Sequence, residues 1–117
     1  MNKRKIGGGY EAKAAGFLQR QGLAIKEKNY RCKMGEVDLV ATDGKYLVFV
    51  EVKYRSDGRS GASLAAVDRK KRRAISRVAQ YYLVTHYGTT EIACRFDVVG
   101  FDGEEIRWIP NAFDFCT

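Results

Sequence analysis

Four ionisable side chains interrupt two segments that otherwise have the apolar and β-branched composition of strands. Glu36 and Asp38 lie in the segment 35–40, and Glu51 and Lys53 lie in the segment 49–53. Carboxylates placed close together repel each other, and removing them from water costs free energy. A bound divalent cation offsets that cost, because hard ions such as Mg²⁺ take carboxylate oxygens and water as ligands. The lysine suits another role, which is to orient or deprotonate an attacking water or to stabilise charge on a phosphate.

The spacing of the two segments predicts that the carboxylates share one face of a sheet. Asp43 and Gly44 between the segments are typical of a tight β-hairpin turn. If these are the two turn residues, Asp38 faces Phe49 and becomes a diagonal neighbour of Glu51. Such neighbours lie about 7–8 Å apart. The lysine falls on the same face, because side chains alternate along a strand with a period of two.

Two interpretations of this face remain open at the level of spacing. Antiparallel strands often have one solvated face, on which Glu36, Glu51 and Lys53 would form a surface charge cluster. The apolar neighbours Leu47 and Phe49 on the same face favour a covered site instead. The opposite face is predicted to hold only apolar side chains, which are Val37, Leu39, Val48, Val50 and Val52.

The rest of the chain predicts two helices and five strands. Apolar residues recur at helical spacing over about 8–21 and 64–87, and a glycine follows each segment as a stop. The strands are expected over residues 23–31, 36–41, 46–54, 92–101 and 105–109, the last one ending at Pro110. The order α-β-β-β-α-β-β indicates an α/β fold with one mixed central sheet of about five strands flanked by helices. Residues 1–117 are expected to form a single domain.

Composition narrows the class of protein. The chain has 21 Lys and Arg against 14 Asp and Glu, a net charge of +7, which favours polyanionic partners such as nucleic acid. No apolar run approaches the roughly 20 residues that cross a bilayer, and no secretory signal is evident, so we expect a cytoplasmic protein with no membrane partner. A single histidine excludes a multi-histidine metal site, and no phosphate-binding loop motif is present.

The motifs together resemble a known family. Glu51-Val52-Lys53, preceded by Asp38, resembles the PD-(D/E)XK nuclease signature. GEVDLV at 35–40, FVEVKYR at 49–55 and RFDVV at 95–99 resemble, more narrowly, the YraN-type family of uncharacterised bacterial proteins. That family is grouped with archaeal Holliday-junction resolvases in the restriction-endonuclease-like fold. The matching stretches run nearly from end to end of the chain.

The resemblance implies a role for individual residues. It makes Asp38 and Glu51 the metal ligands from the sheet, adds the backbone carbonyl of Val52 and a glutamate of the first helix, Glu11, and gives Lys53 the task of assisting the attacking water. The catalytic set is thus Asp38, Glu51 and Lys53, with Mg²⁺ or Mn²⁺ as the expected cofactor. Glu36 belongs to the family's own motif without an assigned role. Tyr10 departs from the glycine usual in that family, and it adjoins Glu11.

Basic and aromatic residues around the motif are the expected DNA contacts. These residues are Arg31, Tyr54, Arg55, Arg59, Lys70, Lys71 and Arg73. The competing interpretation of the basic run at 69–73 is a solvated helix face.

The expected function is that of a metal-dependent DNA endonuclease acting on branched or recombination-intermediate DNA. Since resolution of a four-way junction needs two cuts related by symmetry, a homodimer is expected. The alternative is a non-catalytic nucleic-acid-binding module that retains the nuclease fold. A third alternative is a scaffold protein that uses the aromatic C-terminal segment as its contact surface.

Overall fold

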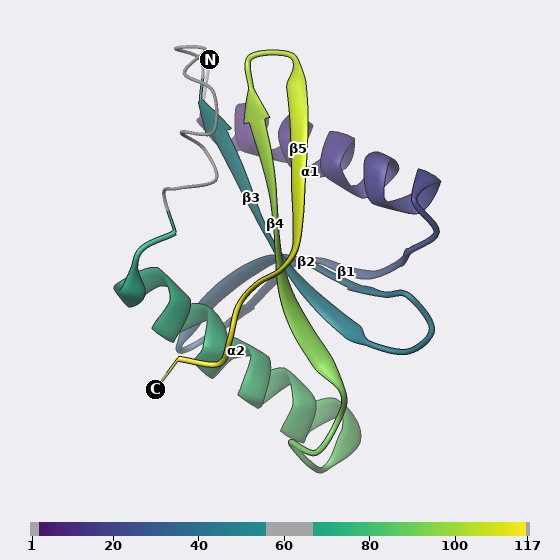
Figure 1. The fold of residues 1–117 in the computed structure, drawn as a ribbon. Coiled ribbons are helices and arrows are strands. Elements are labelled where there is room, and N and C mark those ends of the chain that lie inside the picture. Colours follow the sequence, from purple (N-terminus) through teal and green to yellow (C-terminus); the bar gives the residue numbers. More distant parts are fainter. Residues whose placement is uncertain (1–2, 56–66, 117) are drawn as a thin grey trace.

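Two helices and five strands follow each other in the predicted order α-β-β-β-α-β-β (Figure 1). The computed structural model describes residues 3–55 and 67–116, apart from the side chains of residues 3–8 and Arg55. The elements are α1 (Lys3–Arg20), β1 (Ala24–Cys32), β2 (Gly35–Thr42), β3 (Leu47–Arg55), α2 (Arg69–Tyr87), β4 (Cys94–Asp102) and β5 (Glu105–Phe113).

The five strands form one mixed sheet, as predicted. The strand order is β1-β2-β3-β4-β5, and every neighbouring pair is antiparallel except β3 and β4, which run parallel. A parallel pair needs a crossover connection, and the segment between β3 and β4 carries α2. The connection therefore brings α2 onto one face of the sheet.

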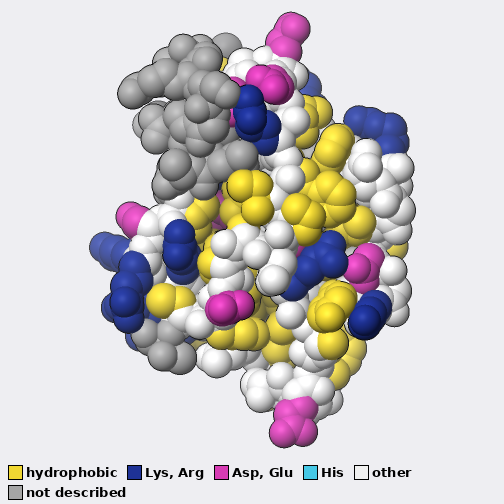
Figure 2. Space-filling view, viewed as in Figure 1, with side chains coloured by type: hydrophobic (Ala, Val, Ile, Leu, Met, Phe, Trp, Pro, Cys, Tyr) yellow, Lys and Arg dark blue, Asp and Glu magenta, His cyan; other side chains and the backbone are white. Residues whose placement is uncertain are grey.

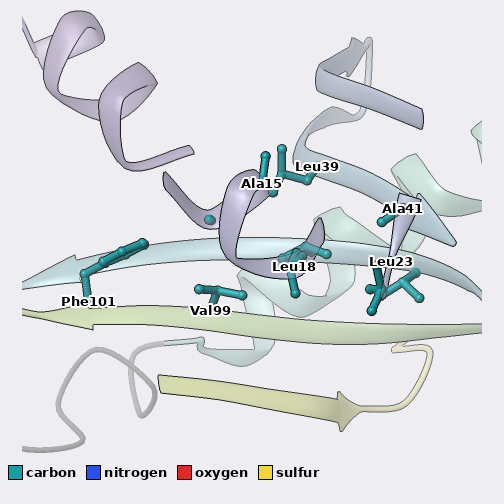
Figure 3. Packing of buried hydrophobic residues seen from close by; sticks show 10 residues of the cluster. Ala15, Leu18, Leu23, Leu39, Ala41, Val99 and Phe101 are labelled. Atoms are coloured by element: carbon teal, nitrogen blue, oxygen red, sulfur yellow. The ribbon is translucent and has the colours of Figure 1, made fainter. Parts of the chain in front are cut away.

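The two helices cover opposite faces of the sheet (Figure 1). Ala15 and Leu18 of α1 pack against Leu39, Val99 and Phe101 (Figure 3). On the other face, α2 contributes Ile75, Val78, Ala79, Tyr82 and Leu83 to a cluster that contains Val40, Leu47, Phe49 and Phe96. Because α2 packs on the face that carries Glu51, the interpretation of a solvated charge cluster is wrong for that residue, which is only 5% exposed.

The hairpin between β2 and β3 has a longer turn than predicted. Leu39 pairs with Val50 and Thr42 with Leu47, so residues 43–46 form a four-residue turn. The Asp43 carboxylate stabilises it by accepting the N–H groups of Lys45 and Tyr46 at 2.9 and 2.7 Å. The register of the paired residues is displaced by two, an even number that keeps their side chains on the predicted faces. Asp38 and Glu51 lie just beyond the paired residues and interact with each other.

Val37 lies on a different face from the one predicted. It packs in the α2 cluster, whereas Leu39 packs in the α1 cluster. The pairing of β2 with β3 begins only at Leu39. The preceding part of β2 is therefore free to twist away from β3, and strict alternation no longer holds there.

The ends of several elements also differ from the prediction. α1 begins at Lys3, earlier than expected. α2 begins at Arg69 because Asp68 caps it by accepting the Lys71 N–H at 2.8 Å, and it ends as predicted before Gly88, which has a positive φ of 73°. β5 continues through Pro110 to Phe113. As an edge strand it tolerates a proline, since the missing N–H has no ladder partner to lose.

No helix among the described residues is long and apolar enough to cross a membrane.

Asp97 of β4 has a structural role in the sheet. Its side chain is fully buried and accepts hydrogen bonds from Arg95 Nε at 3.0 Å, Trp108 Nε1 at 3.0 Å and the Asn111 N–H at 2.9 Å. Arg95 also contacts the Asp43 carboxylate at 2.9 Å. This network ties β5 and the β2–β3 turn to the middle of the sheet.

We expect Asp97→Ala to lower the free energy of unfolding by about 3 kcal/mol, because it leaves the Trp108 Nε1–H and the Asn111 N–H without their acceptor and takes one of two carboxylate partners from the half-buried Arg95. Urea denaturation measures this, with Asp114→Ala as an exposed control that should change stability by less than about 0.5 kcal/mol. An Asp97→Ala protein as stable as the control variant would contradict the structural role.

Candidate metal centre

Four carboxylates from three elements meet where β2 and β3 separate. Glu11 comes from α1, Glu36 and Asp38 from β2, and Glu51 from β3. One oxygen of each of Glu11, Glu36 and Asp38 lies within 4.8 Å of the other two. Glu51 joins this group through Asp38, whose charge and hydrogen bonding both act on it. The three residues predicted as side-chain metal ligands are thus brought together, and Glu36 accompanies them.

Asp38 is held in place by the backbone of β3. The ladder between β2 and β3 ends at the pair Leu39–Val50. Beyond it, the Val52 N–H donates to Asp38 Oδ2 at 2.7 Å. The carboxylate is therefore fixed in orientation by a main-chain donor. The contact shown for Val52 is its N–H, and its carbonyl as a metal ligand stays a prediction.

Glu51 is the most buried of the four acids. Burial, and after it the charge and hydrogen bonding of the neighbouring Asp38, raises the pKa of Glu51 to about 8. Lys71 and Lys53 oppose this rise, since a nearby positive charge favours the carboxylate. The Nζ of Lys71 lies 3.8 Å from Glu51 Oε1. Partial compensation by two lysines leaves an acid that ionises only with difficulty in the metal-free protein.

One carboxylate oxygen of Glu11 has an unsatisfied hydrogen-bonding capacity. Its Oε2 is buried without a hydrogen-bond partner among the described residues. Burial and the charge of Asp38 raise the pKa of Glu11, whereas hydrogen bonding with Asn29 lowers it. An orphaned carboxylate oxygen in this position costs free energy that a cation would recover.

The donor set fits a hard divalent cation. All four side chains offer oxygen, and neither histidine nor cysteine is among them. Oxygen-only sets suit Mg²⁺, Mn²⁺ and Ca²⁺ rather than zinc or copper. Opposite ligands of Mg²⁺ lie about 4.2 Å apart, twice the usual metal–oxygen distance. One oxygen of each of Glu11, Glu36 and Asp38 lies within 4.8 Å of the other two, so a modest approach of the side chains would bring the three to one ion.

Some of the other predicted site residues contact the carboxylates, and others lie away from them. Lys53 is half-buried, and its charge reaches Glu51. Arg31 forms an ion pair with Glu36, with Nε and Oε2 3.2 Å apart. Tyr54 lies on the α1 side, stacked on Tyr10. The Arg55 side chain and Arg59 lie outside the part of the chain that the structure describes.

The basic side chains at the start of α2 differ in their surroundings. Lys71 turns toward Glu51, whereas Lys70 is exposed and Arg73 is half-buried. Figure 2 shows Lys and Arg side chains gathered over the N-terminal part of α2. The ion pair of Lys71 with Glu51 joins this positively charged part of α2 to the carboxylates.

Sequence reasoning missed two contacts of the centre. Lys71 was predicted to bind phosphate, but its ion pair with Glu51 was not anticipated. Lys71 stands four and seven residues before the buried Ile75 and Val78, a spacing that places it on the sheet-facing side of the helix. The second missed contact is the hydrogen bonding of Asn29 with Glu11. Asn29 has a positive φ of 54° in the middle of β1, and no sequence pattern indicates this conformation.

Comparisons with known proteins find relatives that match most of the chain. A sequence model described as "Uncharacterised protein family UPF0102" matches residues 10–101. A UPF0102 protein of Lachnoclostridium phytofermentans is 47% identical over 114 residues, covering 97% of each chain. UPF0102 proteins of Nitrosomonas europaea and Methylococcus capsulatus are 46% and 47% identical, covering 86% and 89% of this chain and 86% of each relative. The matched range contains all four carboxylates and both lysines.

In the metal-free protein we expect the variant Glu51→Gln to become more stable than the wild type as the pH rises. The Glu51 carboxyl has a pKa of 4.5 when unfolded and about 8 when folded. The stability contributed by the protonated form is therefore fully present below about pH 4.5 and is lost as the pH rises through about 8.

Urea denaturation in EDTA measures the effect. The two proteins should be similar near pH 5 and differ near pH 8.5 by a few kcal/mol, since each pKa unit is worth about 1.4 kcal/mol. Glu91→Gln, an exposed position, is the matched control and should follow the wild type. If the free energy of unfolding of the wild type and of Glu51→Gln changed in parallel with pH, the pKa of Glu51 would not be raised and the prediction would be wrong.

Proposed function

The chain belongs to the uncharacterised protein family UPF0102, and we propose that it is a metal-dependent endonuclease that hydrolyses phosphodiester bonds of DNA. One observation carries the proposal, namely the meeting of four carboxylates with two lysines at one partly buried place. Oxygen ligands for a hard cation beside ammonium groups suit the hydrolysis of a phosphodiester, in which negative charge accumulates on phosphate oxygens.

The motif resemblance supports the same chemistry. Asp38 and the Glu51-Val52-Lys53 triplet lie in the arrangement that the PD-(D/E)XK signature implies, with the acids on neighbouring strands and the lysine two residues further along β3. We propose on this basis that the chain is a member of that nuclease superfamily and is similar to the archaeal Holliday-junction resolvases.

In this proposal the carboxylates bind the metal ion. Glu11, Asp38 and Glu51 would hold a Mg²⁺ or Mn²⁺ ion, and Glu36 lies close enough to take part. The bound ion supplies Lewis-acid polarisation of the phosphate and lowers the pKa of a coordinated water.

Lys53 orients the attacking water and stabilises the charge that grows on the phosphate. The water oxygen forms a bond to phosphorus while the bond to the leaving oxygen breaks, and the leaving oxygen ends with a proton. Lys71 stabilises the ionised form of Glu51 through their ion pair, so it keeps that ligand available.

The charge distribution favours nucleic acid as the substrate. The net charge of +7 and the positive surface over the start of α2 suit a polyanion, and Lys70 and Arg73 are the residues there that we propose as phosphate contacts (Figure 2). Branched DNA is the proposed preferred form, with a second copy of the chain supplying the symmetric cut.

We expect Lys53→Ala to reduce cleavage about 100-fold without loss of DNA binding, since the lysine acts on the reacting water and not on the metal ligands. Single-turnover assays with linear, flapped and four-way-junction DNA in Mg²⁺, Mn²⁺ or EDTA test this. Lys45→Ala, an exposed residue of the β2–β3 turn, is the matched control and should cut like the wild type.

Two outcomes would overturn the proposal in different ways. A wild-type protein that binds DNA but cuts none of these substrates with either metal is a non-catalytic nucleic-acid-binding module. Cleavage by Lys53→Ala at the wild-type rate would place the activity elsewhere.

A further inference from the structure

Two tyrosines stack on each other beside the candidate metal centre. Tyr10 of α1 and Tyr54 of β3 have ring centroids 4.1 Å apart with an angle of 24° between the rings. Tyr10 immediately precedes Glu11, and Tyr54 immediately follows Lys53. The stack is therefore one residue from the carboxylate group through Tyr10, whereas Tyr54 and Lys53, as neighbours on one strand, point to opposite faces of the sheet.

The stack has a buried end and an open end. Tyr10 also packs on the buried Phe101, with centroids 5.0 Å apart, whereas Tyr54 is 42% exposed. Hydrogen bonding with Tyr54 raises the pKa of Tyr10, which shows that the two hydroxyl groups interact as well as the rings. Tyr54 is thus an aromatic surface held in a fixed orientation and left accessible to solvent.

A pocket of about 490 Å³ opens at this surface. The two tyrosines form one wall, and the turn between β4 and β5, with Gly103 and Glu104, forms the other. Lys13 lines it from α1, with Nζ 5.1 Å from the centre of the Tyr10 ring. Its volume lies within the range of about 300–1,000 Å³ that is usual for ligand sites.

These groups match the parts of a nucleotide. An open aromatic face stacks a base of any sequence. The Lys13 ammonium suits a phosphate, and the Glu104 carboxylate accepts hydrogen bonds from an exocyclic amino group. A base inside a duplex is already stacked on its neighbours and cannot enter a side pocket, so only an unpaired nucleotide fits.

We propose that this pocket binds one unpaired nucleotide of the strand whose phosphodiester lies at the metal centre, so that the substrates are DNAs with a single-stranded segment next to the cut. This inference rests on the proposed nuclease function. The neighbouring carboxylate group, the positive charge of the chain and the lysine in the pocket favour a nucleic-acid strand over an apolar peptide side chain.

The test is a binding assay in EDTA, in which no cleavage is needed. A duplex with a splayed single-stranded arm is compared with a blunt duplex of the same length, and 2-aminopurine in the arm reports stacking by loss of fluorescence. We expect the wild type to quench the probe and to prefer the splayed substrate at least about fivefold, the lower end of what one stacked base contributes.

The variants separate stacking from other effects. Tyr54→Ala should abolish both the quenching and the preference, whereas Tyr54→Phe keeps the ring and should retain them. Lys13→Ala, at an exposed position where folding is not at risk, should weaken the preference. Tyr81→Ala, an exposed tyrosine on α2, is the matched control and should behave as the wild type.

The assignment of the pocket to an unpaired nucleotide would be overturned if the wild type bound the splayed and the blunt duplex equally, or if Tyr54→Ala kept the preference for the splayed duplex. Equally tight binding of a free mononucleotide would assign the pocket to a small ligand and overturn the strand assignment. A protein that cuts DNA without preferring the splayed form refutes this inference alone. A protein that prefers it but never cuts refutes the nuclease proposal alone.

Discussion

Repulsion among four carboxylates at one place in the fold is the constraint on which the rest of the structure depends. Glu11, Glu36 and Asp38 approach within 4.8 Å of one another, and Glu51 adds a fourth acid that is almost fully buried. Like charges at this separation, away from water, cost several kcal/mol unless a positive charge or a proton compensates them. The structure supplies only partial compensation. Arg31 pairs with Glu36 at 3.2 Å, but the ion pair from Lys71 to Glu51 is 3.8 Å long, and one oxygen of Glu11 lacks a hydrogen-bond partner among the described residues.

The topology explains how these groups come together. β2 and β3 pair only from Leu39–Val50 to the turn, so the strands separate at the point where Asp38 and Glu51 stand. The parallel pairing of β3 with β4 requires a crossover, and the helix of that crossover carries Lys71 to the Glu51 side of the sheet. α1 covers the other face and brings Glu11 to the same opening. The helices on the two faces thus exclude water from Glu51 and part of the water from the other three acids, which strengthens the repulsion among them.

Local patterns in the sequence predicted most of the fold and the central part of the site. The order of elements follows from helical and strand periodicity, and Asp38 and Glu51 were placed on one face because an error of two residues in register leaves alternation unchanged. The register itself escaped prediction, since the Asp43 side chain stabilises a longer turn than the Asp-Gly pair suggests. The ion pair between Lys71 and Glu51, the face of Val37 and the stacking of Tyr10 on Tyr54 depend on how helices pack on a twisted sheet, and no short-range pattern encodes them.

The central claim is that the carboxylates form one binding site for a hard divalent cation. Calorimetric titration of the metal-free protein with Mn²⁺ tests it most directly, with Asp38→Asn as the variant that keeps the shape of the side chain and removes its charge. Asp114→Asn, at an exposed position, serves as the control. The account predicts saturable binding to the wild type and the control, and at least a tenfold loss of affinity in Asp38→Asn. Equal affinity of the wild type and Asp38→Asn for Mn²⁺ would contradict it.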